Sequence, residues 1–555
     1  MGPSGTRNSH FSPEQASSSF ANPSQSMKPD ESKTANVEAR VRLMWDGVIN
    51  NSGLVVSGLV SLILVPILLR GLGAEAYGLW IAAMVLGSLM SVLDLGLGTS
   101  VIREVAATLS TETSDETTRF VKATGYAYLA SALVGALLIA ILGVPLSAGL
   151  HLSAGIRQIA FTVFVFAGLT FAGDQLRAFT GSILYGLRRF DAANLVLIVA
   201  VLLRAGGVII LLRLGRGLVA VATWHAVTAA TTALVGFAVV SRLSPHFRFR
   251  LGRFAWGSLR THIPFGVASQ IAMWLINAIW SVPPLLIGAV LGSPSLTQFH
   301  IGQKFPLAVS GFTWRVGEAV FPAASESERA NNLPRTREIL EVGTRWIIVL
   351  ALPICLVLSI VGADLLQVWV GEVRPDTVKV FRLTTAAVFI SAMGDGALNL
   401  LWGRGAMRTI LVTVSGMAVL SVGLTLAFLF WVGIVGAAWA LLGTVTLGWL
   451  AYVRAASHAC GIGMFGLIRA TSRGLLIPFV ACAVPALGIT HSRYAGGWLA
   501  VVGASFVAGC AYAAALYVSG GREEERAIIR RPAVLAVSLV RSFYRGVWGT
   551  SRRAP

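Results

Sequence analysis

Three basic residues stand inside long apolar segments of this 555-residue chain. Arg204 lies about twelve residues into one segment, and Lys304 and Arg315 share another. A charge at the centre of a bilayer costs about 2.5 to 3.5 kcal/mol on insertion scales, so such residues are candidates for a functional site. Lys304 and Arg315 are eleven residues apart, which places them within about 20° of one helix face and about 16 Å apart along it. We therefore expect these three cations to bind an anionic group, and Arg204 most of all because no acid lies near it in the sequence.

Acidic residues near the other cations support a competing, structural interpretation. Glu318 follows Arg315 by three residues, so the two can pair on one helix face while Lys304 extends its amine to the membrane surface. Asp174 and Arg177 have the same spacing, and there we expect a structural ion pair.

Uncharged polar residues also recur with helical spacing. One face of the segment near 263–291 carries Gln270, Trp274, Asn277 and Ser281. A similar series near 380–402 consists of Asp395, Asn399 and Trp402. Amides and aromatic rings can bind the hydroxyls and ring faces of sugars, but they also serve helix packing. We expect structural roles for two other residues: His225 packs in the core, and Asp94 anchors to Arg103 or to a neighbouring bundle.

The composition of the chain places these residues in a membrane. Hydrophobic residues make up 55% of the sequence and charged residues only 12%, and the mean hydropathy is +0.74. Soluble domains carry about 25% charged residues, and about fourteen apolar segments are long enough here to cross a hydrocarbon core of roughly 30 Å as helices. We therefore expect an all-α polytopic membrane protein with about fourteen transmembrane helices.

An internal similarity predicts how these helices are grouped. VPILLRGLGAEAYGLW (65–80) and PPLLIGAVLGSPSLTQF (283–299) both pass from a proline-flanked apolar run through Leu-Gly into a short turn, and Gly73 corresponds to Gly292. The two copies lie six spans apart, which predicts two parallel six-helix bundles plus two C-terminal helices. The expected parts are a disordered cytoplasmic tail at 1–46, an N-terminal bundle at 47–240, a basic cytoplasmic linker at 241–262, a C-terminal bundle at 263–453, two additional transmembrane helices at 454–518 and a basic cytoplasmic tail at 519–555.

The basic residues predict the orientation. Of the 44 Lys and Arg, 32 fall on one alternating set of tails and connections, seven on the other set and five within spans. The positive-inside rule places the first set and both termini in the cytoplasm, and the turn at 70–76 outside. The tail at 519–555 mixes eight arginines with apolar and aromatic residues, which fits an interfacial helix on anionic lipid or a disordered basic tail.

The sequence contains no motif for covalent catalysis, metal binding or a phosphate-binding glycine loop. The four cysteines, Cys355, Cys460, Cys482 and Cys510, form no Cys-x-x-Cys pair. We therefore expect no enzymatic activity, no cofactor and no metal. Because the basic residues are spread between apolar segments, we also expect no nucleic-acid partner.

One segment resembles a known family. Residues 66–106, PILLRGLGAEAYGLWIAAMVLGSLMSVLDLGLGTSVIREVA, are similar to the N-terminal signature of the bacterial polysaccharide (O-antigen) flippases, which belong to the multidrug/oligosaccharidyl-lipid/polysaccharide exporter superfamily. The shared features are the Leu72–Gly73 turn, the helix start at Tyr77–Trp80, the exit at Asp94–Gly98 and the basic Arg103. The second half is similar at Leu286–Gly292 and Phe321–Ser325, and the later spans match only in number and length.

The resemblance implies a transporter of the bacterial plasma (inner) membrane that flips polyprenyl-diphosphate-linked oligosaccharide to the outer leaflet by alternating access. The substrate-binding candidates are then Arg204, Lys304 and Arg315 for the diphosphate, and Gln270, Trp274 and Asn277 for the sugars. The candidates for ion coupling or gating are Glu318, Asp395, Asp174 and Arg177. The expected partners are the lipid-linked oligosaccharide, anionic lipids at the basic cytoplasmic segments, and a polysaccharide polymerase or export machinery.

Three alternatives remain open at this point. A cation-coupled multidrug exporter of the same superfamily would carry acids deep in the N-terminal bundle, where this sequence has Arg204. A membrane glycosyltransferase or polymerase would need a long outward loop or several outward acids, and the first outward turn has only Glu75. A non-transporting partner of a polysaccharide assembly complex is compatible with the basic tails.

Overall fold

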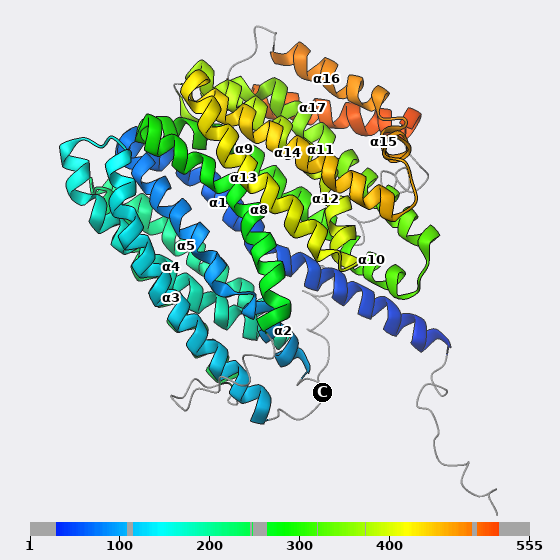
Figure 1. Ribbon diagram of the computed structural model, residues 1–555, viewed down its shortest axis with the longest axis horizontal. Coiled ribbons are helices and arrows are strands. Elements are labelled where there is room, and N and C mark those ends of the chain that lie inside the picture. Colours follow the sequence, from blue (N-terminus) through cyan, green and yellow to red (C-terminus); the bar gives the residue numbers. More distant parts are fainter. Residues whose placement is uncertain are drawn as a thin grey trace, which may run out of the picture.

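The computed structural model describes residues 29–107, 115–244, 247, 263–318, 320–371, 373–490 and 497–520. Every element assigned in these ranges is a helix. Most of the helices run side by side, with α3, α4 and α5 on one flank of the molecule and α16 and α17 on the other (Figure 1). The expected all-α polytopic fold is confirmed.

The helices of the first half are α1 (Pro29–Leu89), η3 (Met90–Asp94), α2 (Leu97–Ala107), α3 (Asp115–Gly149), α4 (Ala154–Gly186), α5 (Phe190–Arg213) and α6 (Leu218–Leu243). The second half contains α8 (Ile263–Leu291), α9 (Ser293–Glu318), α10 (Val320–Arg329), α11 (Leu333–Val370), α12 (Pro375–Gly403), α13 (Met407–Val432) and α14 (Ile434–Ala459). The chain continues through α15 (Met464–Ser472), α16 (Leu476–Thr490), α17 (Gly497–Ala515) and η5 (Leu516–Gly520).

Eleven helices in the described ranges are long and apolar enough to cross a membrane. The short α15 and the 15-residue α16, which meet at a bend of 55°, add a twelfth crossing. A break at Gly73 divides α1 into two crossings, and the more polar α9 lies between α8 and α11. The expected number of about fourteen is reached only if α1 is counted twice and α9, which is less apolar than the eleven, is included.

Gly73 reverses the direction of the chain. Its φ of 79° lies in the left-handed region, which glycine tolerates because it has no Cβ atom. Before the break, α1 follows α5 along its length, since Gly53 lies beside Asn194 and Gly71 beside Leu212. After the break, α1 returns to the end where the Trp274 indole of α8 reaches its last residue, Leu89. The Leu-Gly turn of the sequence is therefore a hairpin.

The first helix starts earlier than the sequence suggested. Residues 29–46 were expected to belong to a disordered tail, but the structure has them within α1. The sequence contains signals for this start, namely a proline at the first helical position and the acids Asp30 and Glu31 in the first turn. Residues 1–28, most of the predicted linker at 241–262 and the tail beyond residue 520 lie outside the described residues.

Small residues determine how closely the helices pack. A Cβ atom added to Gly78 would lie 2.4 Å from the backbone oxygen of Ser293, which shows that α1 and α9 touch backbone to backbone. The same holds for Gly168 of α4 against Ala136 of α3, at 2.6 Å. Such contacts are typical of membrane helices, where association depends on close packing rather than on burial from water.

The C-terminal helices α16 and α17 attach to α11. Tyr512 donates a hydrogen bond to the backbone oxygen of Val349 at 3.0 Å. The buried guanidinium of Arg345 donates to the oxygens of Thr471 and Arg473, at 3.3 and 2.7 Å, and so fixes the bend between α15 and α16. On the outer side, apolar residues of α17 such as Leu499 remain exposed, as expected of a surface that faces lipid.

Candidate functional site

Two arginines share one carboxylate between α4 and α5. Arg204 Nη2 lies 2.7 Å from Asp174 Oδ1, and Arg177 Nε lies 3.3 Å from the same oxygen. The side chains are 20%, 30% and 23% exposed for Arg204, Asp174 and Arg177 respectively, so all three are largely buried. The expected Asp174–Arg177 pair is present. Arg204, which lacks a nearby acid in the sequence, receives one from a neighbouring helix thirty residues earlier.

This cluster retains positive charge and free hydrogen-bonding capacity. One carboxylate faces two guanidinium groups, and Arg204 Nε has no hydrogen-bond partner among the described residues. A guanidinium presents several donors in a rigid fork that matches carboxylate and phosphate geometry. The cluster can therefore accept an anion without giving up its internal ion pair.

His225 of α6 joins this cluster to the returning part of α1. It lies close enough to Arg204 and Asp174 to interact with their charges, and its ring meets the indole of Trp80 edge-to-face at a centroid distance of 4.6 Å. His225 packs in the core as expected, but its buried Nε2 has no partner among the described residues. It is therefore a second polar group oriented toward the charged cluster.

On the next turn of α1, Tyr77 contacts the second half of the molecule. Its hydroxyl lies 3.4 Å from Nδ1 of His300 in α9, and the two rings are 6.0 Å apart. Lys304 follows His300 by one helical turn and lies close enough to interact with it electrostatically. His300 was not among the predicted site residues, although its spacing of four residues from Lys304 is visible in the sequence.

These residues form what we call the central polar group: Asp174, Arg177, Arg204, His225, His300 and Lys304. They come from α4, α5, α6 and α9, and Tyr77 and Trp80 of α1 lie between the two subsets. Trp80 contacts His225 and Tyr77 contacts His300, and residues three apart on a helix are neighbours, so one stretch of α1 touches both subsets. Three cations stand against a single carboxylate, so the group is suited to an anion.

Arg315 is placed differently. Its Nη1 lies 3.0 Å from Glu318 Oε2, and the two side chains are 47% and 43% exposed. Trp314 donates to the other carboxylate oxygen of Glu318 at 3.0 Å. The competing interpretation predicted this pair from the sequence. Glu318 thus has two partners near the end of α9, fourteen residues beyond Lys304.

The polar face of α8 contacts the point where α1 passes into η3. Gln270 Nε2, Trp274 Nε1 and Asn277 Nδ2 donate to the backbone oxygens of Ser91, Leu89 and Ser88, at 3.1, 2.6 and 3.5 Å. A helix end leaves carbonyl groups without intrahelical partners, and these side chains satisfy them. The residues expected to contact sugars therefore also tie the second half of the chain to the first.

The second half of the molecule encloses a small cavity around Asp395. The cavity has a volume of about 70 Å³, and its aromatic lining consists of Trp280, Trp314, Trp449 and Tyr452. Asp395 is 7% exposed, and the buried hydroxyl of Tyr452 has no hydrogen-bond partner among the described residues. Asn399 points its amide to the backbone oxygen of Asp395, at 2.9 Å, rather than to the carboxylate. Among the residues that the structure describes, no arginine or lysine lines this cavity.

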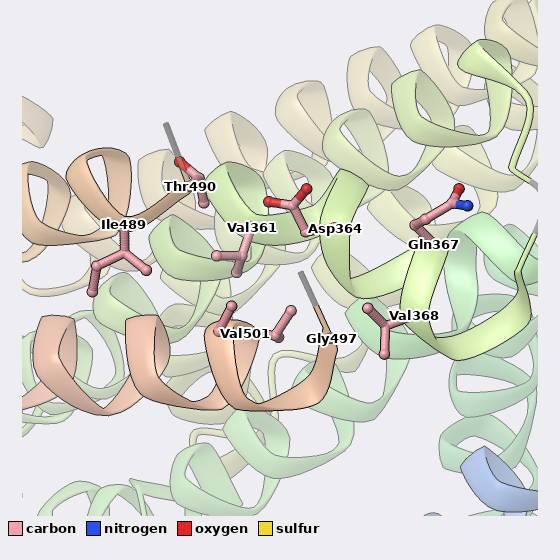
Figure 2. A pocket seen from close by; sticks show the side chains of 9 residues that line it. Val361, Asp364, Gln367, Val368, Ile489, Thr490, Gly497 and Val501 are labelled. Carbon is pink, nitrogen blue, oxygen red and sulfur yellow. The ribbon is translucent and has the colours of Figure 1, made fainter. Parts of the chain in front are cut away.

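A second cavity, of about 110 Å³, opens between α11 and the two C-terminal helices. Figure 2 shows Val361 and Asp364 of α11 between Thr490 at the end of α16 and the start of α17. The sequence analysis did not predict this site. Asp364 ends a long apolar run and was the available signal.

The partners of Asp94 differ from the predicted anchor to Arg103 or to a neighbouring bundle. Arg103 lies 3.5 Å from its neighbour Glu104, whereas Asp94 forms hydrogen bonds with the Tyr128 hydroxyl and the Gly98 backbone. Tyr128 is also hydrogen-bonded to Ser182 of α4. The expected pairing with Arg103 is therefore wrong, because a buried tyrosine from α3 reaches the carboxylate while Arg103 extends outward.

In the described ranges, no three His, Cys, Asp or Glu side chains are grouped closely enough to hold a metal ion. The four cysteines are free thiols, three of them buried. Cys460 lies just beyond the end of α14, and burial raises the pKa of its thiol. None of these groups adds reactive chemistry to the central polar group.

Known structures share this fold. The lipid II flippase MurJ in an inward closed conformation superposes with a TM-score of 0.64 at 13% identity, over 85% of this chain and 98% of that one. An inward-facing multidrug resistance MATE transporter of the MOP superfamily gives 0.58 at 14% identity, over 76% of this chain and 98% of the other. An outward-facing MATE transporter gives 0.53 at 16% identity, over 76% and 95%.

Sequence comparison assigns the family. No curated protein matches the chain. The family model described as polysaccharide biosynthesis protein matches residues 44–328, which include α8, α9 and most of the N-terminal half. This match covers just over half of the 555 residues. The chain therefore belongs to the polysaccharide biosynthesis protein family, with the fold of the MOP superfamily transporters.

Proposed function

We propose that this protein flips polyprenyl-diphosphate-linked oligosaccharide repeat units from the cytoplasmic to the outer leaflet of the bacterial inner membrane. Its family concerns polysaccharide biosynthesis, and the MurJ structure that shares its fold is described as a lipid II flippase. Both termini are cytoplasmic in this proposal, as the distribution of basic residues predicts. The product then serves surface polysaccharide synthesis, together with a polymerase or export machinery.

The observation that carries the proposal is the charge of the central polar group. Arg177, Arg204 and Lys304 outnumber its one acid, and the group bridges the two halves through α1. Transport of a diphosphate requires such cations at membrane depth, because the phosphates would otherwise enter a medium of low dielectric constant unpaired. Arg204 and Lys304 would contact the phosphates. While Arg204 binds a phosphate, Arg177 would remain paired with Asp174, so that this carboxylate keeps a basic partner.

The contacts of α1 suggest how the halves separate. Near its hairpin, Ser293 donates to the backbone oxygen of Glu75 at 2.6 Å, and Thr297 to that of Ala74 at 2.7 Å. The Glu75 carboxylate accepts a hydrogen bond from the Ser153 backbone. We place this end on the outside, where these bonds hold the pathway shut. Release of substrate to the outer leaflet would break them and move α9 away from α1.

We propose that Asp395 couples transport to the binding and release of a proton or a cation. It is a carboxylate without a basic partner in its cavity, and it lies on α12 against α9, which also carries Lys304. A carboxylate that binds a proton or a cation in one state and releases it in another can bias two conformations. Glu318 is the less favoured candidate, because Arg315 and Trp314 already hold its carboxylate.

The test is the leaflet distribution of lipid-linked oligosaccharide in cells that lack the protein and receive variants of it. Wild type should move the substrate to the outer leaflet, and Arg204→Ala should leave it on the cytoplasmic side. Arg213→Ala is the matched control, because it removes an exposed arginine from the same helix, α5. A normal distribution in cells without the protein would overturn the proposal.

A cation-coupled multidrug exporter is the second candidate. The observation in its favour is the cavity of tryptophans around the carboxylate of Asp395, which suits an organic cation. If cells without the protein become sensitive to cationic drugs while their surface polysaccharide stays intact, this function replaces the first.

A further inference from the structure

A groove between α5 and α6 lies on the outer surface of the first half. It has a volume of about 440 Å³ and is separate from the central polar group. Its lining recurs every four residues on α5, at Asp191, Leu195, Val199 and Leu203. Leu195 is 62% exposed, and Val199 and Leu203 are also exposed, so the groove opens to the surroundings of the helices rather than to the interior. In a membrane those surroundings are lipid.

The groove has one basic end and one apolar end. Arg189 and Asp191 of the α5 start and Arg242 of the α6 end line it at the same end. From Asp191 to Leu203 the chain rises about 18 Å, which is close to the depth of one leaflet in a core of roughly 30 Å. The remaining walls are valines and leucines, with Thr231 and Thr232 bonded to their own helix.

The deep end is closed by a contact between the same two helices. The Trp224 indole of α6 donates to the backbone oxygen of Leu203 at 3.0 Å. Gly207 allows this approach, since a Cβ atom there would lie 1.9 Å from the indole nitrogen. The groove is therefore a blind channel that starts at the basic end and stops near mid-membrane.

The charges at the mouth favour an anion. Arg189 forms two hydrogen bonds with Asp191, at 3.1 and 3.0 Å, which leaves this pair neutral overall. Arg242 is exposed and forms no ion pair with any residue that the structure describes. The described residues that line the mouth therefore carry a net charge of plus one, in reach of a headgroup whose acyl chain lies between α5 and α6.

We propose that this groove binds an anionic phospholipid of the cytoplasmic leaflet. The phosphate pairs with Arg242, and one acyl chain fills the space between Leu195, Val199 and Val235. The cytoplasmic leaflet is the one that carries the excess of anionic lipid, and Arg189 and Arg242 lie at the end that the positive-inside rule assigns to the cytoplasm. The site differs from the proposed transport path, because no described residue of α1 or α9 lines it and because it takes a lipid that stays in its leaflet.

The experiment is native mass spectrometry of the full-length protein, offered equal amounts of phosphatidylglycerol and phosphatidylcholine with identical acyl chains. Wild type should retain phosphatidylglycerol preferentially. Arg242→Gln should reduce this preference about fivefold, as expected for one basic residue near the membrane surface. Val199→Trp should remove retention by filling the groove. Arg213→Gln, at the opposite end of α5, is the control and should behave as wild type.

Three outcomes would overturn the site. Equal retention of both lipids by wild type would make the groove ordinary lipid contact. Displacement of phosphatidylglycerol by inorganic phosphate, but not by chloride of equal ionic strength, would show that the apolar walls do not hold a chain. Stronger retention of polyprenyl phosphate would assign the groove to the transport substrate. None of these outcomes affects the leaflet assay with Arg204→Ala, so the two proposals fail separately.

Discussion

Asp174 and Asp395 are both largely buried carboxylates in the middle of long helices, but their surroundings have opposite character. Asp174 accepts from two arginines and lies near His225. Asp395 shares a cavity with three tryptophans and a tyrosine, with no cation in the lining. The first acid restrains and positions positive charge, whereas the second can itself take up a proton or a cation. The two halves thus place the same side chain in two different chemical environments.

This contrast also separates the two halves functionally in our proposal. The first half would bind most of the anionic headgroup. The second half would bind the proton or cation whose gradient drives transport. We call the contact of α1 with α8 and α9 the seam between the two halves. Since α1 contacts α9 through Tyr77, a conformational change in one half can be transmitted to the other across this seam. Substitutions that exchange or remove these charges test the division.

The largest effect is expected from Arg204→Glu. It would place two acids beside Arg177 and reverse the charge that the diphosphate requires, so flipping should fall at least tenfold, by roughly 1.4 kcal/mol or more in transition-state free energy. Measurement of outer-leaflet substrate per molecule of folded protein gives the result. Arg204→Lys keeps a cation and should retain part of the activity, and Arg213→Glu should have little effect. Normal flipping by Arg204→Glu would remove Arg204 from the path.

The next effect concerns Asp395→Asn, which keeps the shape of the side chain and removes its charge. We expect normal folding, because no described residue forms an ion pair with Asp395, but about a tenfold loss of flipping driven by a proton or sodium gradient. Purified protein in vesicles with an imposed gradient provides the assay. Asp174→Asn is the comparison: it should lower thermal stability, because two arginines lose their common partner. If the gradient drives flipping by Asp395→Asn as it does in wild type, a residue other than Asp395 couples flipping to the gradient.

A third effect tests the backbone contact at the seam. Gly78→Ala adds a Cβ atom that would lie 2.2 Å from Ser293 Oγ, so α1 and α9 must move apart. Overpacking of this kind costs about 1 to 3 kcal/mol, and we expect a lower thermal unfolding temperature in detergent. Gly87→Ala on the same helix is the control, because its nearest neighbour would be at 3.9 Å. Equal unfolding temperatures for both variants would mean that the tight contact is absent in solution.

The sequence predicted the all-α membrane fold because hydrophobic length is a strong local signal. The Gly73 hairpin and the Asp174–Arg177 and Arg315–Glu318 pairs were also predictable, since they depend on residues close together in the chain. The helical start at Pro29 was missed, because polar composition outweighed the helix-start signals there.

The partners of isolated polar residues could not be predicted. Arg204 and Asp174 are thirty residues apart, and the bonds from Gln270 and Trp274 reach the backbone of the first half across 179 and 185 residues. Such contacts depend on how the helices pack, which cannot be read from the spacing of residues along the chain. His300 shows the complementary failure: its spacing from Lys304 was visible, but nothing in the sequence brought Tyr77 beside it.

The smallest effect is expected at the other end of the contact between the two halves, where side chains of α8 bond to backbone oxygens of α1 and η3. Trp274→Phe keeps most of the ring and removes the donor that bonds the Leu89 oxygen at 2.6 Å. Loss of one such hydrogen bond costs about 0.5 to 1.5 kcal/mol, so the unfolding temperature should fall by less than in Gly78→Ala. Trp431→Phe, on the exposed surface of α13, controls for loss of an indole. Because this end must part when the transporter faces the cytoplasm, we expect Trp274→Phe to raise access of a membrane-impermeant thiol reagent to Ser281→Cys. Unchanged labelling would show that α8 and α1 do not separate there.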